Sequence, residues 1–74
     1  MTPRAHYTEQ LELLHTEVLR MGDLAKEMVK KGVQSFLTSD VELRNEVAGL
    51  DHEIYNQEMV IERHCVELIA LHQP

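Results

Sequence analysis

The sequence predicts an all-α protein built as an antiparallel hairpin of two long helices. Apolar and small residues recur every three or four positions along most of its 74 residues, which is the period of an amphipathic helix and not of a strand. One sharp break divides this pattern, and so short a connection makes two helices antiparallel neighbours. We expect a single domain over residues 1–74, with helices at about 4–37 and about 40–72 and a turn at about 38–39.

The first helix is predicted from a sustained apolar stripe. Its members are Tyr7, Leu11, Leu14, Val18, Met21, Ala25, Met28, Gly32 and Phe36. Four more apolar residues flank it: Leu13, Leu24, Val29 and Val33. A stripe of this width indicates a helix that contacts more than one neighbour. Thr2 is a candidate N-cap because Pro3 follows it at a position that tolerates proline. We expect Lys26, Lys30 and Lys31 in the last turns, where the helix dipole favours cations.

The second helix is expected to open with a capping box, in which Ser39 is the N-cap and Glu42 reaches back to it. Its stripe runs through Leu43, Val47, Leu50, Ile54, Gln57 or Glu58, Ile61, His64 or Cys65, Leu68 and Leu71. The polar residues in the middle have two explanations: the helix turns its face between neighbours, or a buried polar element fixes register or partner choice. Pro74 marks the expected end.

Charge is unevenly distributed in this chain. The net charge is −6, and residues 40–74 carry eight acids against Arg44 and Arg63. Such a surface repels phosphate backbones, so we expect no nucleic-acid partner. No apolar run reaches the roughly 18 residues that would cross a bilayer, and no signal-peptide core is visible, so no membrane insertion is expected. The single cysteine, Cys65, cannot form an internal disulfide, and a cytoplasmic location is expected.

Two constellations invite a metal-site interpretation. Glu12 and His15 have the Glu-x-x-His spacing of di-iron helix bundles, but only one copy is present. Glu58, Cys65 and His72 lie on one line seven residues apart. Seven residues rise about 10.5 Å, which is too far for one helix to offer them to one ion. A site built across a dimer is the remaining alternative, and we expect no metal site and no cofactor.

No catalytic residue is expected, and the chain is predicted not to be an enzyme. Ser39 is explained as a cap, Ser35 has no accompanying oxyanion element, and phosphate-binding and dinucleotide fingerprints are missing from the sequence. Two helices leave apolar faces uncovered, so we expect either self-association into a four-helix bundle scaffold or a third helix. The exposed acids of the second helix are candidates for a binding surface: Glu46, Glu53, Glu62 and Glu67.

The order and spacing of several weak motifs resemble the PhoU family. In the first helix they are Leu11, Met21-Gly22 and Leu24. In the second they are Asp40, Glu42-Leu43, Val47, Asp51, Ile54, Glu58, Ile61, Cys65, Ile69 and Gln73-Pro74. Tyr55 departs from the pattern, because many members are acidic there. The resemblance covers about 68 residues, two helices of the first of two tandem three-helix bundles.

The resemblance implies a role as well as a fold. It implies a cytoplasmic, non-enzymatic adaptor that represses the phosphate-starvation response when phosphate is plentiful. The partners it implies are the ATPase of the phosphate ABC transporter and the sensor histidine kinase of that response. The acidic motif that the family associates with metal ions lies outside this chain, so the resemblance carries over no metal site.

Overall fold

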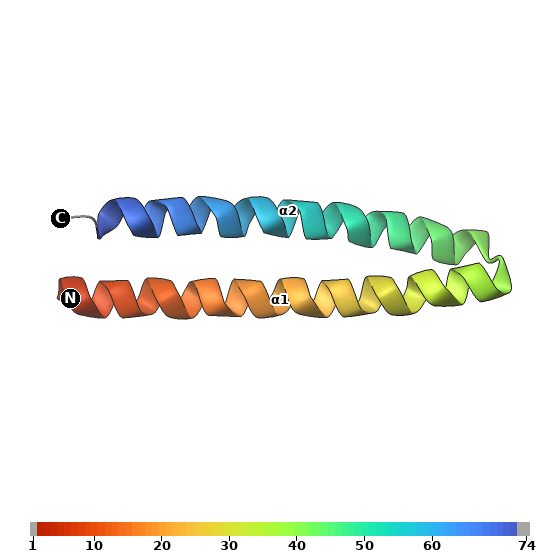
Figure 1. The fold of residues 1–74 in the computed structure, drawn as a ribbon, viewed down its shortest axis with the longest axis horizontal. Coiled ribbons are helices and arrows are strands. Elements are labelled where there is room, and N and C mark those ends of the chain that lie inside the picture. The colour runs from red at the N-terminus through yellow and green to blue at the C-terminus, as the bar shows by residue number, and fades with distance from the viewer. Residues whose placement is uncertain (1, 73–74) are drawn as a thin grey trace.

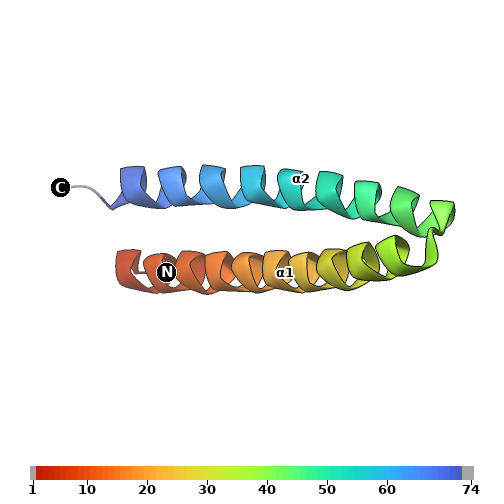
Figure 2. The same cartoon turned by 45° about the vertical axis from the view of Figure 1, so that its right-hand side comes forward.

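The protein is a rod of two antiparallel helices. The computed structural model describes residues 2–72, in which α1 (Pro3–Thr38) and α2 (Val41–Leu71) lie side by side along their whole length (Figures 1 and 2). The rod measures 54 × 15 × 15 Å. The start of α1 and the end of α2 lie at one end of the rod, and the turn lies at the other (Figure 1). The predicted all-α hairpin is confirmed. Each helix end falls one residue from the position expected from the sequence, and Pro74 lies outside the described residues.

The start of α1 agrees with the sequence prediction, but its end does not. The Thr2 hydroxyl accepts a hydrogen bond from the Ala5 N–H at 3.1 Å, and proline occupies the first turn. Thr2 is therefore confirmed as the N-cap. The lysine expectation was wrong, because the last turn of α1 contains no basic residue. The helix continues to Thr38, well beyond Lys31, and the dipole acts only within the final turn.

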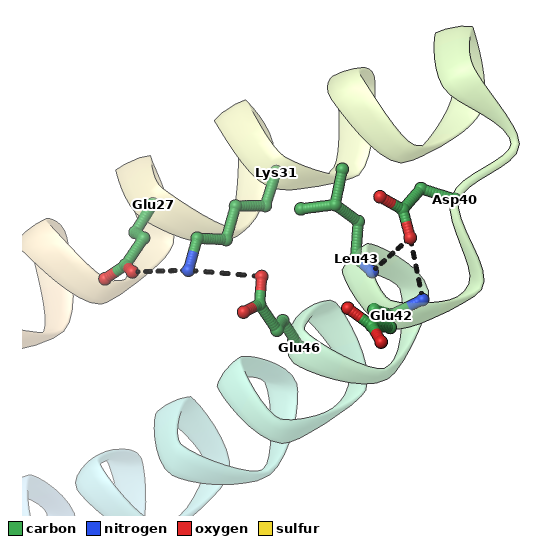
Figure 3. Close-up of polar contacts among 6 residues, drawn as sticks. All are labelled: Glu27, Lys31, Asp40, Glu42, Leu43 and Glu46. Carbon is green, nitrogen blue, oxygen red and sulfur yellow. Dashed lines mark hydrogen bonds and ion pairs between the residues drawn. The ribbon is translucent and has the colours of Figure 1, made fainter.

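The turn corrects the predicted capping box. Ser39 is not the N-cap of α2 but the C-cap of α1, with φ 56° and ψ 31°, and its N–H donates to the Ser35 carbonyl at 2.9 Å. Asp40 caps α2 instead: its Oδ1 accepts from the Glu42 and Leu43 N–H groups at 2.9 and 3.3 Å (Figure 3). A helix commonly ends on one left-handed residue. Ser39 takes that position, so the next residue, itself a strong N-cap type, opens α2.

The seam between the helices is narrow. On α2 its partly or fully buried residues are Leu43, Val47, Leu50, Ile54, Gln57, Val60, Ile61, His64, Cys65 and Leu68. On α1 they are His6, Gln10, Leu14, Glu17, Met21, Leu24, Ala25, Met28, Lys31, Gly32 and Ser35. Among the described residues only Leu24 and Leu50, each 8% exposed, form a buried apolar core. The prediction for α2 holds as far as Leu68, but Leu71 is 60% exposed.

Four residues of the predicted α1 stripe lie outside the seam. Tyr7, Leu11, Val18 and Phe36 are all exposed. The physical reason is that the apolar surface of α1 is wider than one neighbour can cover. The seam takes one edge of that surface, together with polar Gln10 and Glu17, and leaves the other edge open to solvent.

Candidate interaction surface

A polar cluster around Glu17 crosses the seam. The Gln57 side-chain amide donates to the Glu17 backbone carbonyl at 3.0 Å. The His64 Nδ1 lies 2.7 Å from the Glu17 carboxylate, whose side chain is only 13% exposed. When this carboxylate is ionised it can only accept a hydrogen bond, and the His64 ring then donates from Nδ1. One residue of α1 thus holds two residues of α2 that lie two turns apart.

The cluster decides between the two explanations of the polar middle of α2. Gln57 and His64 both lie in the seam, whereas Glu58 is exposed. A one-turn slip of the helices would separate both from Glu17, so the cluster favours one register. Sequence reasoning missed Glu17, because it lies outside the apolar stripe.

A second polar bridge joins the helices nearer the turn. Lys31 Nζ lies 3.1 Å from the Glu27 carboxylate and 3.5 Å from that of Glu46 (Figure 3). The hydrogen bond that Lys31 donates to Glu27 raises the pKa of Lys31 above 10.5. Desolvation of the ammonium opposes this shift, and the charge of Glu46 reinforces it. The bridge sets Lys31 of α1 beside an acid near the start of α2.

The residues considered for metal binding do not converge. Glu12 and His15 are exposed on α1, and Cys65 is partly buried in the seam. His72 meets the ring of Tyr7 edge-on, with centroids 4.3 Å apart. Within residues 2–72, no three His, Cys, Asp or Glu side chains are grouped so that they could hold a metal ion.

The two serines have structural partners. The Ser35 hydroxyl donates to the Gly32 carbonyl at 2.8 Å, and Ser35 is buried at 8% exposure. The backbone of Ser39 ends α1.

In the described part of the chain, neither helix is long and apolar enough to span a bilayer.

The largest unpartnered feature of α1 is an exposed apolar ridge. This α1 ridge consists of Tyr7, Leu11, Val18, Val29 and Phe36, which are 37 to 85% exposed. At 3.6 residues per turn these side chains fall within roughly 40° of one another. The ridge adjoins the seam, and near the turn it borders an open groove between the helices that is lined by Gly32, Phe36 and Val47 among others. Aligned apolar side chains of this kind are typical of a surface that receives another helix.

Comparison with known proteins supplies the family. The family model described as the PhoU domain matches residues 18–74. The chain belongs to the PhoU family. The matched segment contains the Glu17-facing part of α2, the turn and the second half of α1. The positions by which the sequence resembled PhoU include seam residues Val47, Ile54 and Ile61 and the capping residue Asp40.

Several relatives are named as accessory proteins of PhoU type. A phosphate-specific transport system accessory protein PhoU homolog from Aquifex aeolicus is 36% identical over 66 residues, 89% of this chain and 30% of the relative. The accessory protein PhoU of Serratia marcescens is 31% identical over 68 residues, 92% of this chain and 28% of the relative. The homolog from Clostridium acetobutylicum is 30% identical over 71 residues, which are 96% of this chain and 32% of the relative. The chain therefore spans less than a third of these relatives. No solved structure matches it.

Proposed function

We propose that this chain is a regulatory adaptor module of a phosphate uptake system. The observation that carries the proposal is the PhoU-domain match over residues 18–74, together with relatives named as phosphate-specific transport system accessory proteins. In this proposal the module acts in the cytoplasm, without catalysis, as a negative regulator of the phosphate-starvation response. Its partners are the transporter ATPase and the sensor histidine kinase.

The geometry suits a module that acts through helix faces. The seam buries few side chains, and much of the apolar surface of both helices faces outward. The polar cluster at Glu17 favours one register, so these faces would be presented in a defined arrangement. Contacts of this kind need no enclosed pocket or bound cofactor, because helix-on-groove recognition relies on apolar anchors spaced along the helix.

Deletion of the gene in its native host tests this function. A reporter driven by a phosphate-starvation promoter should then be active in phosphate-rich medium, and the wild-type gene should silence it again. A Val18→Glu variant, altered on the α1 ridge, should restore repression less well than Glu12→Gln, a matched change at another exposed position of α1. Unchanged reporter output after deletion would refute the proposed role.

We further propose that the 74-residue chain self-associates through the α1 ridge. A hairpin with two buried apolar side chains has a small core, and chains of this size usually need further burial to be stable. A second copy packed on the ridge would complete a four-helix bundle. Across a concentration series, the sedimentation coefficient should rise to that of a dimer, and helicity should rise with it. Val18→Glu should abolish both increases. A helical monomer at all concentrations would contradict self-association.

A further inference from the structure

A second exposed apolar line runs along the outer side of α2. This α2 stripe consists of Val41, Ala48, Tyr55, Met59 and Val66, all exposed to solvent. Its spacing is seven, seven, four and seven residues, which returns each member to nearly the same side of the helix. At 3.6 residues per turn its members lie within roughly 40° of one another and roughly 150° from the middle of the seam. The stripe is therefore separate from both the seam and the α1 ridge.

The seam does not explain the α2 stripe. A helix that packs on one neighbour is normally polar on its opposite side. The opposite side of α1 is mixed: it carries Glu12, Thr16, Asp23, Lys30 and Gln34, but also Leu19, Val33 and Leu37. On α2, Tyr55 at 58%, Met59 at 38% and Val66 at 62% exposure lie on this side, with Glu62 and Arg63 in the turn between Met59 and Val66. Aligned apolar residues on an outer face indicate a second contact.

One margin of the α2 stripe is mainly acidic, whereas the other carries Asn45, His52 and Arg63. Asp51, Glu58 and Glu62 follow one edge, and none of them forms an ion pair within residues 2–72. Across the stripe, Met59 and Val66 form the floor of a shallow groove of about 340 Å³, which Glu62, Arg63 and Glu67 complete. Seven acids and two bases lie in α2 as a whole. An apolar line with a net negative border is complementary to an apolar line with a positive border.

We propose that the α2 stripe is the docking surface for a basic amphipathic helix of a partner protein. Tyr55 and Met59 are its central anchors, because a large aromatic ring and an adaptable thioether contribute most of the contact area. Asp51, Glu58 and Glu62 pair with lysine or arginine side chains of the partner, and they orient its approach. The proposal rests on the adaptor function proposed above, and it defines the chemical class of the partner.

Two designed peptides test the chemistry of the partner. Both are helices of about three heptads with leucine along one face. One carries lysine beside the leucines, and the other carries glutamate. Each is labelled with fluorescein and titrated with the 74-residue chain while anisotropy is recorded. The lysine peptide should bind, and its affinity should fall as salt rises from 50 to about 500 mM, because salt screens exposed charges. The glutamate peptide should not bind.

Point variants locate the surface. Tyr55→Ala should weaken binding of the lysine peptide about tenfold or more, as expected for a central anchor. Leu19→Ala is the matched control, because Leu19 on α1 is also 58% exposed, and it should leave affinity unchanged. Glu62→Lys should weaken binding of the lysine peptide, whereas Glu12→Lys, which inverts the same charge on α1, should have less effect. Circular dichroism of each variant checks that helicity is retained.

Three results would overturn this proposal. They are equal binding of both peptides, loss of binding through Val18→Glu but not through Tyr55→Ala, and self-association that Tyr55→Ala abolishes, which would assign the stripe to a second copy. The adaptor function is tested separately by the reporter. Failed peptide binding with an intact deletion phenotype removes only the docking surface, whereas an unaffected reporter removes the adaptor role whatever the peptides do.

Discussion

The turn offers a sharp test, because two adjacent residues should respond in opposite directions. Ser39 adopts a left-handed backbone conformation, with φ 56° and ψ 31°, and Asp40 holds two N–H groups of α2 with one carboxylate oxygen. Replacement of Ser39 by glycine should stabilise the hairpin. Replacement of Asp40 by alanine should destabilise it.

The magnitudes follow from the two conformations. A left-handed non-glycine residue costs about 1–2 kcal/mol, and glycine removes this cost. Glycine also gives the unfolded chain more freedom, which offsets about 0.4–1 kcal/mol of the gain. The net increase in the free energy of unfolding for Ser39→Gly should be about 0.5–1 kcal/mol. Asp40→Ala loses the N-cap, which typically lowers the free energy of unfolding by about 0.5–2 kcal/mol.

Urea unfolding followed by circular dichroism at 222 nm measures both changes at one fixed protein concentration. Ser39→Ala serves as a control, because alanine keeps the left-handed cost and should change stability little if Ser39 acts through its backbone. Were Ser39 instead the N-cap of α2, Ser39→Ala would lower stability by about 1 kcal/mol and Asp40→Ala would be nearly silent. That pattern would refute the assignment of the turn.

Three further predictions concern the seam. Leu50→Ala should lower the free energy of unfolding by about 2 kcal/mol, the low end for such truncations, because Leu50 borders a narrow core. If urea unfolding shows a loss below about 0.5 kcal/mol, Leu50 is not buried in the seam. His64→Ala should lower the free energy of unfolding by about 1.5–3 kcal/mol, because it leaves the Glu17 carboxylate without its partner. Replacing both Glu17 and His64 by leucine should recover most of this loss. A double-mutant cycle that finds no coupling energy between the two residues would contradict the pair. The pKa of Lys31 is raised above 10.5, so its stabilising contribution is complete below pH 10.5 and is lost as the pH rises through the higher folded-state pKa. The free energies of unfolding of the wild type and of Lys31→Met should therefore converge as the pH rises through that range. A difference that stays constant with pH would disprove the linkage.

The helices could be predicted from the sequence, because their signals are local. The 3–4 residue period runs through both segments, and the N-cap at Thr2 needs only its neighbour Pro3. The cap of α2 could not be predicted from the same rules. Ser39 and Asp40 are both good N-cap residues, and the choice depends on where α1 ends and which residue takes the left-handed position. That choice is made by the two helices together.

The seam face of α1 was harder still to predict. Hydrophobicity alone favours Leu11 and Val18, but the helices turn toward Glu17, whose two polar contacts with α2 have no apolar periodicity to announce them. A residue pairing between Glu17 and His64, 47 positions apart, leaves no local trace in the sequence. The apolar surfaces of both helices were predictable, whereas their division between seam and exterior required the structure.

The position of the two chain ends has a mechanical consequence. The start of α1 and the end of α2 lie at the same end of the rod (Figure 1), so a force that draws them apart loads the cross-helix contacts one after another. The Tyr7–His72 contact carries the load first, then the Glu17–His64 pair, then Leu24 and Leu50, and the Lys31–Glu46 bridge near the turn last. Tension across the chain ends therefore unzips this hairpin, and each contact must resist it alone.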